Sequence, residues 1–167
     1  YAFGTRAIHA GAIPDPVTGA RATPIHQTTS FVFDSADHAA SLFNLQTFGN
    51  VYSRLSNPTV AALEERVAAL EGGRAAVASA SGMAAEAMAL MTILQSGDHV
   101  VCAGALYGGT VTMLAVNLAK FGIETSFVEV TRPEAFAEAM RPNTRAVFAE
   151  TLGNPSLTVL DIAAVAE

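Results

Sequence analysis

Short apolar runs alternate with longer apolar or amphipathic stretches from residue 57 to residue 167, and this alternation constrains the fold more than any other feature. Short runs of this kind are typical of buried strands, and the longer stretches are typical of helices. Strands that alternate with helices predict an α/β fold, with a mostly parallel sheet covered by helices. The expected strands are Ala75–Ala80, His99–Ala103, Glu124–Val130 and Arg145–Glu150.

The expected helices begin and end at residues that favour helix termini. Asn57 is a good N-cap, Pro58 suits the first helical position, and Gly72 suits the position after the last turn. Further helices are expected at 82–95, at 109–121, at 133–140 and from about residue 161 onward. One face of the first helix collects four apolar residues, namely Val60, Leu63, Val67 and Leu70.

The first 57 residues lack this regularity. They contain turn signals such as Ile13-Pro14-Asp15-Pro16 and a short aromatic run, Phe31-Val32-Phe33. A stretch this long without regular structure is uncommon inside a compact domain. We therefore expect residues 1–57 to form an extended arm that contacts a neighbouring subunit, and residues 58–167 to form the first part of the main domain.

The composition excludes some partners and favours others. Charged residues make up only 14% of the chain and apolar residues 51%, so we expect part of the surface to be buried against another subunit or against more of the same chain. The net charge of -6, with nine Lys plus Arg, argues against nucleic acid and against an anionic membrane surface. The longest apolar run, Gly82–Leu94, is too short to span a bilayer. The single cysteine, Cys102, favours a reducing compartment such as the cytoplasm, and its apolar neighbours predict an inert, buried thiol.

Two stretches are able to bind a phosphate. The first, Ala78-Ser79-Ala80-Ser81-Gly82-Met83, stands at a strand-to-helix junction, where unpaired backbone N–H groups and the helix dipole favour an anion. The second, Tyr52-Ser53-Arg54, offers a hydroxyl from Tyr52 and a forked guanidinium from Arg54. The alternatives are an ordinary capped turn and a surface arginine near a helix start.

Two further stretches follow later strands, and in parallel sheets binding sites lie outside the carboxyl ends of the strands. In Tyr107-Gly108-Gly109-Thr110 the tyrosine is able to lie flat on a planar ligand, or else it fills a groove between helix and sheet. In Glu150-Thr151-Leu152-Gly153-Asn154 a carboxylate and an amide close an apolar strand, where both need partners, although Asn154 is also suited to capping a turn. The four histidines have no metal-ligand spacing, so no metal site is expected.

Together and in this order, the four motifs resemble the Cys/Met-metabolism family of fold-type I enzymes that use pyridoxal 5'-phosphate (PLP). The resemblance covers essentially the whole chain and implies the fold of those transferases, with an extended N-terminal arm. It implies that Ser81, Gly82 and Met83 hold the cofactor phosphate and that Tyr52 and Arg54 reach the same phosphate from a neighbouring subunit. It implies that Tyr107, as the catalytic residue of this chain, stacks on the pyridine ring, while Asn154 lies near the ring hydroxyl and Glu150 supports that side. Members of the family usually form homotetramers built from two dimers.

Within the family, two stretches are most similar to the O-acetylhomoserine sulfhydrylases: 43–50, and 153–155 running into 159–162. This implies γ-replacement on O-acetylhomoserine with sulfide or a thiol, which gives homocysteine or methionine. Two positions depart from the pattern. Gly109 stands where methionine γ-lyases often carry cysteine, and Met83 stands where sulfhydrylases often carry histidine. Cystathionine γ-synthase and methionine γ-lyase remain alternatives.

The expected cofactor needs a lysine to hold it as a Schiff base. The chain has one lysine, Lys120, late in an expected helix where a lysine faces water. In the family the Schiff-base lysine and the arginine for the substrate carboxylate lie further along the chain, so we expect a fragment that is inactive by itself. A non-catalytic α/β module that binds a phosphorylated ligand or a partner chain is the alternative from a different class.

Overall fold

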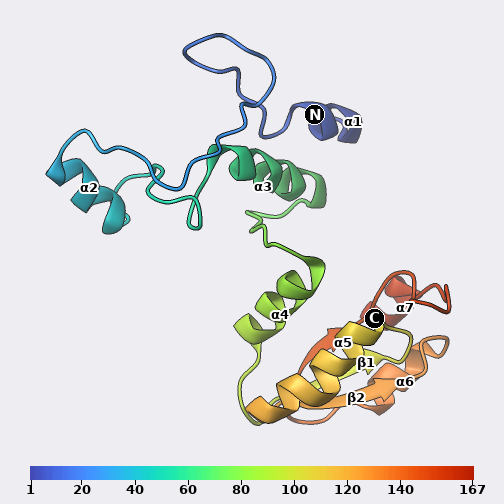
Figure 1. Cartoon of the computed structure of the whole chain (residues 1–167). Coiled ribbons are helices and arrows are strands. Elements are labelled where there is room, and N and C mark those ends of the chain that lie inside the picture. The colour runs from blue at the N-terminus through green and yellow to red at the C-terminus, as the bar shows by residue number, and fades with distance from the viewer. The chain divides into compact units, whose positions relative to one another are not determined.

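The computed structural model describes all of residues 1–167, and they form two compact units, Tyr1–Ala78 and Ser79–Glu167. Figure 1 shows the helices and strands of each unit. No helix has the length and apolar character that crossing a membrane requires. In chain order the elements are α1 Phe3–His9, α2 Ala36–Phe43, α3 Pro58–Glu71, α4 Gly82–Ile93, β1 His99–Ala103, α5 Gly108–Thr112, the π-helical η1 Met113–Asn117, the 3-10 helix η2 Leu118–Phe121, β2 Glu124–Val128, α6 Pro133–Glu138, β3 Thr144–Phe148 and α7 Ile162–Ala166.

The second unit is built on a sheet of three strands in the order β2-β1-β3. Both pairs of neighbours are parallel, and His99 of β1 lies opposite Glu124 of β2 and Thr144 of β3. Every residue of β1 is buried. This is expected for the central strand of a parallel sheet, because helices cover both of its faces. The structure thus confirms the predicted parallel sheet and the predicted bounds of its central strand.

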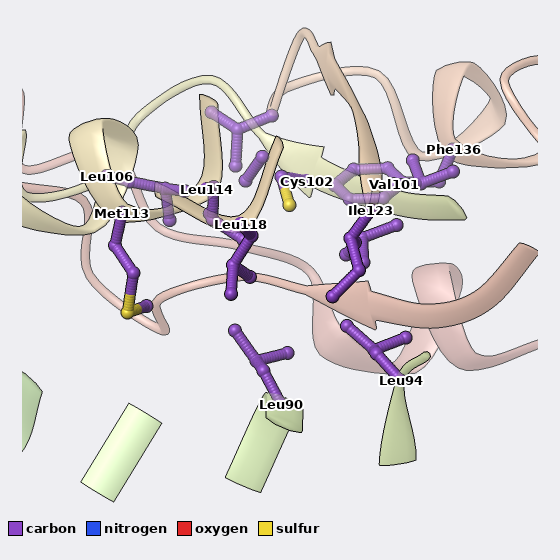
Figure 2. Packing of buried hydrophobic residues seen from close by; sticks show 13 residues of the cluster. Leu90, Leu94, Val101, Cys102, Leu106, Met113, Leu114, Leu118, Ile123 and Phe136 are labelled. Atoms are coloured by element: carbon purple, nitrogen blue, oxygen red, sulfur yellow. The ribbon is translucent and has the colours of Figure 1, made fainter. Parts of the chain in front are cut away.

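A single hydrophobic core surrounds β1 (Figure 2). Leu90 of α4 and Leu94 just after it point toward Leu118 and Ile123. Phe136 of α6 is 2% exposed and belongs to the same cluster. Helices that precede β1 in the sequence and helices that follow it therefore contribute side chains to the same core, as the alternating pattern predicted.

The helix expected at 109–121 is present but is not uniform. It begins as α5, widens into the π-helical η1 and tightens into η2, which ends at Gly122 with φ 77°. The N–H of Leu118 donates to the carbonyl of Met113, an i→i+5 bond. This wide turn places Met113 and Leu118 on the same buried side of the helix.

The prediction of a strand at Ala75–Ala80 is wrong. The segment forms neither strand nor helix, and Val77 is 71% exposed. The N–H of Ala78 donates instead to the Glu64 carboxylate, 2.7 Å away. An apolar run predicts burial, but a strand also needs a neighbouring strand to receive its hydrogen bonds, and the sheet order β2-β1-β3 does not include this segment.

The other predicted elements exist with shorter ends. β2 ends at Val128 rather than Val130, because the chain turns there and the N–H of Arg132 donates to the carbonyl of Glu129. β3 runs from Thr144 to Phe148, so Glu150 lies beyond the strand. α4 and α6 also end two residues before the predicted positions. Such differences of one or two residues are usual where helices fray.

The first unit contains three helices, and two of them, α1 and α2, lie within the first 57 residues, which were predicted to lack regular structure. α1 packs on α3, where Arg6 donates to the carbonyl of Ala69 at 2.7 Å and Arg66 donates to the carbonyl of Ala10 at 2.9 Å. α3 begins and ends as predicted, since the Asn57 side chain accepts from the N–H of Thr59 and Gly72 is left-handed.

The apolar face of α3 is not covered in this structure. Val60 is 39% exposed, Leu63 is 56% exposed and Val67 is 41% exposed. The recorded contact of α3 with α1 is made elsewhere on the helix, where the carbonyl of Ala69 accepts from Arg6. The apolar periodicity of α3 therefore has no packing partner within this structure.

A buried histidine links the three strands at their amino ends. His99 is 0% exposed, with Nδ1 2.8 Å from the Thr144 hydroxyl and Nε2 2.9 Å from the Ser126 hydroxyl. Arg141 donates to the same Ser126 hydroxyl at 3.1 Å and pairs with Glu124 at 2.6 Å. Burial, together with the positive charge of Arg141, lowers the pKa of His99, and Glu124 opposes this only partly.

We expect the protein to lose stability in acid through His99. Because its pKa is lower in the folded state than the 6.5 of an unperturbed histidine, the unfolded chain binds the proton more readily. The contribution of His99 is therefore complete above about pH 6.5 and decreases as the pH falls below that value. Urea unfolding midpoints between pH 8 and pH 5 measure this slope. His99→Gln should flatten it, whereas the same change at the exposed His9 should not, and an equal slope in both variants would contradict the assignment.

Candidate functional site

The start of α4 presents backbone donors to open space. The Ser81 side chain caps the helix by accepting from the N–H of Ala84 at 3.1 Å. The N–H groups of Gly82 and Met83 lie in the first turn, where no carbonyl of the same helix is in reach. A side chain added at Gly82 would meet nothing within 4 Å. This helix start is therefore free to receive an anion, and the helix dipole favours one there.

Tyr107 lies beside this helix start, at the entrance to α5. A Cβ atom added at Gly109 would lie only 2.6 Å from Cε1 of the Tyr107 ring and 3.4 Å from the sulfur of Met83. The ring of Tyr107 thus occupies the space that a side chain at residue 109 would need, next to Met83. Tyr107 is 51% exposed, so part of the side chain is accessible to a ligand.

Glu150 holds the residue before α5 in place. Its Oε1 atom accepts a hydrogen bond from the backbone N–H of Tyr107 at 2.8 Å, across 43 positions of sequence. Glu150 follows β3, and Tyr107 follows β1, which is the neighbouring strand of the sheet. The carboxylate therefore connects two strand ends and fixes the backbone from which the tyrosine projects.

Asn154 lines a separate hollow beside the same strand ends. The hollow has a volume of about 420 Å³, and its walls come from the loops that follow the three strands. Leu106, Val130 and Ser156 line it together with Asn154. The structure thus gathers Ser81, Met83, Tyr107 and Glu150 around the starts of α4 and α5, and places Asn154 in the adjacent loop.

Tyr52 and Arg54 belong to the first unit and lie together there. The guanidinium carbon of Arg54 is 5.0 Å from the centre of the Tyr52 ring, which is within range of a cation–π contact. Tyr52 pairs with Ser30 through an isolated antiparallel bridge. Both side chains are exposed, so hydroxyl and guanidinium are accessible to an anion from outside the unit.

Two other residues discussed in the sequence analysis, Lys120 and Cys102, lie in places that suit a structural role. Lys120 is exposed in the last turn of η2, as predicted for a lysine near a helix end. Cys102 is fully buried, and burial raises the pKa of its thiol to about 12, so the thiol stays protonated. No group of three or more His, Cys, Asp or Glu residues is arranged to hold a metal ion.

One contact at this site was not foreseen. Thr110 is 0% exposed, and its hydroxyl donates to the Glu86 carboxylate at 2.8 Å and lies 3.7 Å from the sulfur of Met83. The signal in the sequence was slight: Glu86 is the one charged residue of α4. Its partner is 24 positions away, which sequence periodicity does not reveal.

The residues present fit the two parts of the cofactor implied by the resemblance. A phosphate needs several donors and open space, which the first turn of α4 supplies around Gly82. A planar ring needs an accessible aromatic face, which Tyr107 supplies next to Met83. Both requirements are met by residues of the second unit alone.

Comparison with known proteins gives relatives over nearly the whole chain. The chain is 55% identical over 163 residues to O-acetyl-L-homoserine sulfhydrylase of Leptospira meyeri, covering 98% of this chain and 37% of the relative. It is 45% identical over 167 residues to L-methionine gamma-lyase of Fusobacterium nucleatum subsp. polymorphum, covering 100% of this chain and 42% of that relative. The chain thus spans about two fifths of the length of these enzymes.

A solved structure has the same fold. It is a putative O-acetylhomoserine (thiol)-lyase from Campylobacter jejuni with N'-pyridoxyl-lysine-5'-monophosphate, and it superposes with a TM-score of 0.89 at 40% identity, covering 97% of this chain and 40% of that one. The sequence pattern that defines the family described as Cys/Met metabolism PLP-dependent enzyme matches residues 4–167. The chain therefore belongs to the Cys/Met-metabolism family of PLP-dependent enzymes.

Proposed function

We propose that these residues form the amino-terminal part of a PLP-dependent enzyme that carries out γ-replacement on O-acetylhomoserine. The other substrate is sulfide or a thiol such as methanethiol, and the product is homocysteine or methionine. The observation that carries the proposal is the open first turn of α4 beside the ring of Tyr107. The 55% identity to a sulfhydrylase supports the choice of reaction.

Each residue of the site receives a role in holding the cofactor. The amides of Gly82 and Met83 bind the phosphate, and the hydroxyl of Ser81 keeps that turn in its capped conformation. Tyr107 lies on the ring and orients it, and Glu150 holds the backbone of Tyr107. Asn154 approaches the ring hydroxyl from the loop after β3. PLP, when bound, supplies the electron sink that the elimination and addition steps need.

The proposed enzyme is assembled from several copies of the chain. Residues 1–57 form the arm that reaches a neighbouring subunit, where Tyr52 and Arg54 contact the phosphate held by that subunit's α4. Their exposure, and the exposed apolar face of α3, support a contact of this kind. We expect a homotetramer made of two dimers, and we place it in the cytoplasm, where a buried unpaired Cys102 stays reduced.

Arg54→Ala in the complete polypeptide should weaken PLP binding about tenfold or more, since hydrogen bonds to charged groups are among the stronger ones. Arg54→Lys should recover only part of this affinity, because an ammonium lacks the forked geometry. Equilibrium dialysis against PLP measures both. Arg21, another exposed arginine of the first unit, provides the matched control, and an equal loss in Arg21→Ala would contradict the role of Arg54.

A mixed oligomer tests whether Arg54 acts across subunits. One chain carries Arg54→Ala, and the other carries Gly82→Glu, which places a carboxylate where the phosphate should bind. If Arg54 acts on a neighbouring α4, the mixed dimer regains one complete site, whereas neither parent has any. Without any recovery in the mixed preparation, Arg54 would act within its own chain.

Substrate assays distinguish the proposed reaction from its alternatives. The complete polypeptide with PLP should show its highest kcat/KM with O-acetylhomoserine and sulfide, compared with cystathionine and with methionine alone. The 45% identity to a methionine gamma-lyase makes methionine the sharpest competitor. Faster elimination from methionine would replace the proposed activity, and failure to bind PLP at all would favour a non-catalytic module.

A further inference from the structure

The hydrogen bond between Thr110 and Glu86 joins the two helix starts that form the candidate site. Glu86 lies one turn after Gly82 on α4, and Thr110 lies in α5, shortly after Tyr107. The Thr110 hydroxyl is completely buried and donates to Oε2 of Glu86 at 2.8 Å. A buried hydrogen bond to a carboxylate is stronger than one between neutral groups, so this contact restrains the distance between the helices.

The same contact reaches the residues that face the cofactor. The Thr110 hydroxyl lies 3.7 Å from the sulfur of Met83. A Cβ at Gly109 would in turn lie 3.4 Å from that sulfur and 2.6 Å from the Tyr107 ring. Glu86, Thr110, Met83 and Tyr107 are therefore neighbours, and a shift of α5 relative to α4 moves the tyrosine relative to the first turn of α4.

The hydrogen bond from Thr110 is the side-chain interaction that Glu86 makes in this structure. It is the one charged residue in an otherwise apolar or small-residue helix, and it is half-buried without an ion-pair partner. A carboxylate in the second turn also repels an anion at the helix start, so it does not serve to attract the phosphate. The hydrogen bond that its carboxylate accepts from the Thr110 hydroxyl explains why a carboxylate stands at this position.

We infer that Glu86 is a positioning residue, which acts through Thr110 to hold the ring of Tyr107 at the correct distance from the phosphate-binding turn of α4. The inference rests on the proposed function, because it concerns how phosphate and ring are held at the same time. The bond would set the separation between the turn that would hold the phosphate and the tyrosine that would lie on the ring.

The test uses the complete polypeptide with PLP and four single variants. Glu86→Ala removes the acceptor, Thr110→Val removes the hydroxyl at nearly constant shape, and Glu86→Gln keeps an acceptor oxygen of the same reach. Thr92→Ala is the control, since Thr92 is on the same helix, is exposed, and bonds only to the carbonyl of Met88. The readouts are the PLP dissociation constant and the visible circular dichroism of the bound cofactor, which reports the orientation of its ring.

Glu86→Ala and Thr110→Val should each weaken PLP binding about tenfold and change the dichroism in the same way. The double variant should be no worse than either single one, because both changes remove the same bond. Glu86→Gln should stay close to wild type, and Thr92→Ala should match it. If Glu86→Ala fails to fold, Thr110→Val and Glu86→Gln still decide the question.

A lower melting temperature with unchanged affinity and dichroism would show a merely structural bond and overturn the inference. Independent, additive losses in the double variant would overturn it as well. Wild-type protein that does not bind PLP would instead contradict the proposed function, so the two failures are distinguishable.

Discussion

Gly109→Ala is expected to displace the ring of Tyr107 and weaken PLP binding by up to about tenfold, while leaving the fold as stable as before or more so. The added Cβ would lie 2.6 Å from Cε1 of Tyr107, closer than atoms can approach, and 3.4 Å from the sulfur of Met83. Tyr107 is half-exposed, so its ring moves outward into solvent rather than disrupting the core. The ligand would lose its aromatic contact, which contributes to affinity on the order of a factor of ten.

The effect on stability should have the opposite sign. Gly109 is not among the glycines with positive φ, so alanine meets no backbone strain there. Replacing a helical glycine by alanine favours the helix by roughly 0.5–1 kcal/mol. Equilibrium dialysis with PLP and thermal unfolding of the apoprotein measure the two effects separately.

Gly108→Ala is the matched control, because a Cβ at Gly108 would meet nothing within 4 Å. It should bring the same gain in helix stability with no loss of affinity. Equal affinities in the two variants would mean that the ring of Tyr107 does not touch the cofactor, and the site would have to be reassigned.

Phe136→Ala should lower the free energy of unfolding by about 3–5 kcal/mol, the usual cost of removing a large buried aromatic side chain. Phe136 is 2% exposed in α6 and belongs to the core cluster around β1, together with Val101 (Figure 2). The cavity it would leave lies in the core between α6 and the central strand, where the surrounding structure has little freedom to collapse.

Phe121→Ala provides the control, since Phe121 is 59% exposed at the end of η2. Its cost should stay below about 1 kcal/mol. The chain contains no tryptophan, so far-UV circular dichroism in urea is the suitable measurement. Both variants are compared at one fixed protein concentration, because any self-association would make the unfolding midpoint depend on concentration. Similar unfolding midpoints for the two variants would contradict the placement of the core.

The places of several candidate site residues in the fold could be predicted from the sequence, because helix starts and strand ends are set by local patterns. Ser81-Gly82 was predicted to open a helix, with an ordinary capped turn as the alternative to phosphate binding, and the structure shows both the helix start and the cap. Tyr107 was expected at the end of β1, and it lies there beside the first turn of α4. The role of each of these residues in holding the cofactor remains a prediction, and the contribution of Tyr52 and Arg54 depends in addition on a second copy of the chain.

The sequence alone determined the alternation of strands and helices and the buried run His99–Ala103. It also determined where helices begin and end, at Asn57, Gly72 and Ser81. Periodicity and capping act between residues a few positions apart, so a local pattern is enough to predict them. Only the tertiary structure decided that Ala75–Ala80 has no strand to pair with, that the apolar face of α3 stays exposed, and that Glu86 meets Thr110. Those outcomes depend on which distant segments come together. Strand hydrogen bonds and buried surfaces each need a partner, and a local sequence pattern does not identify that partner.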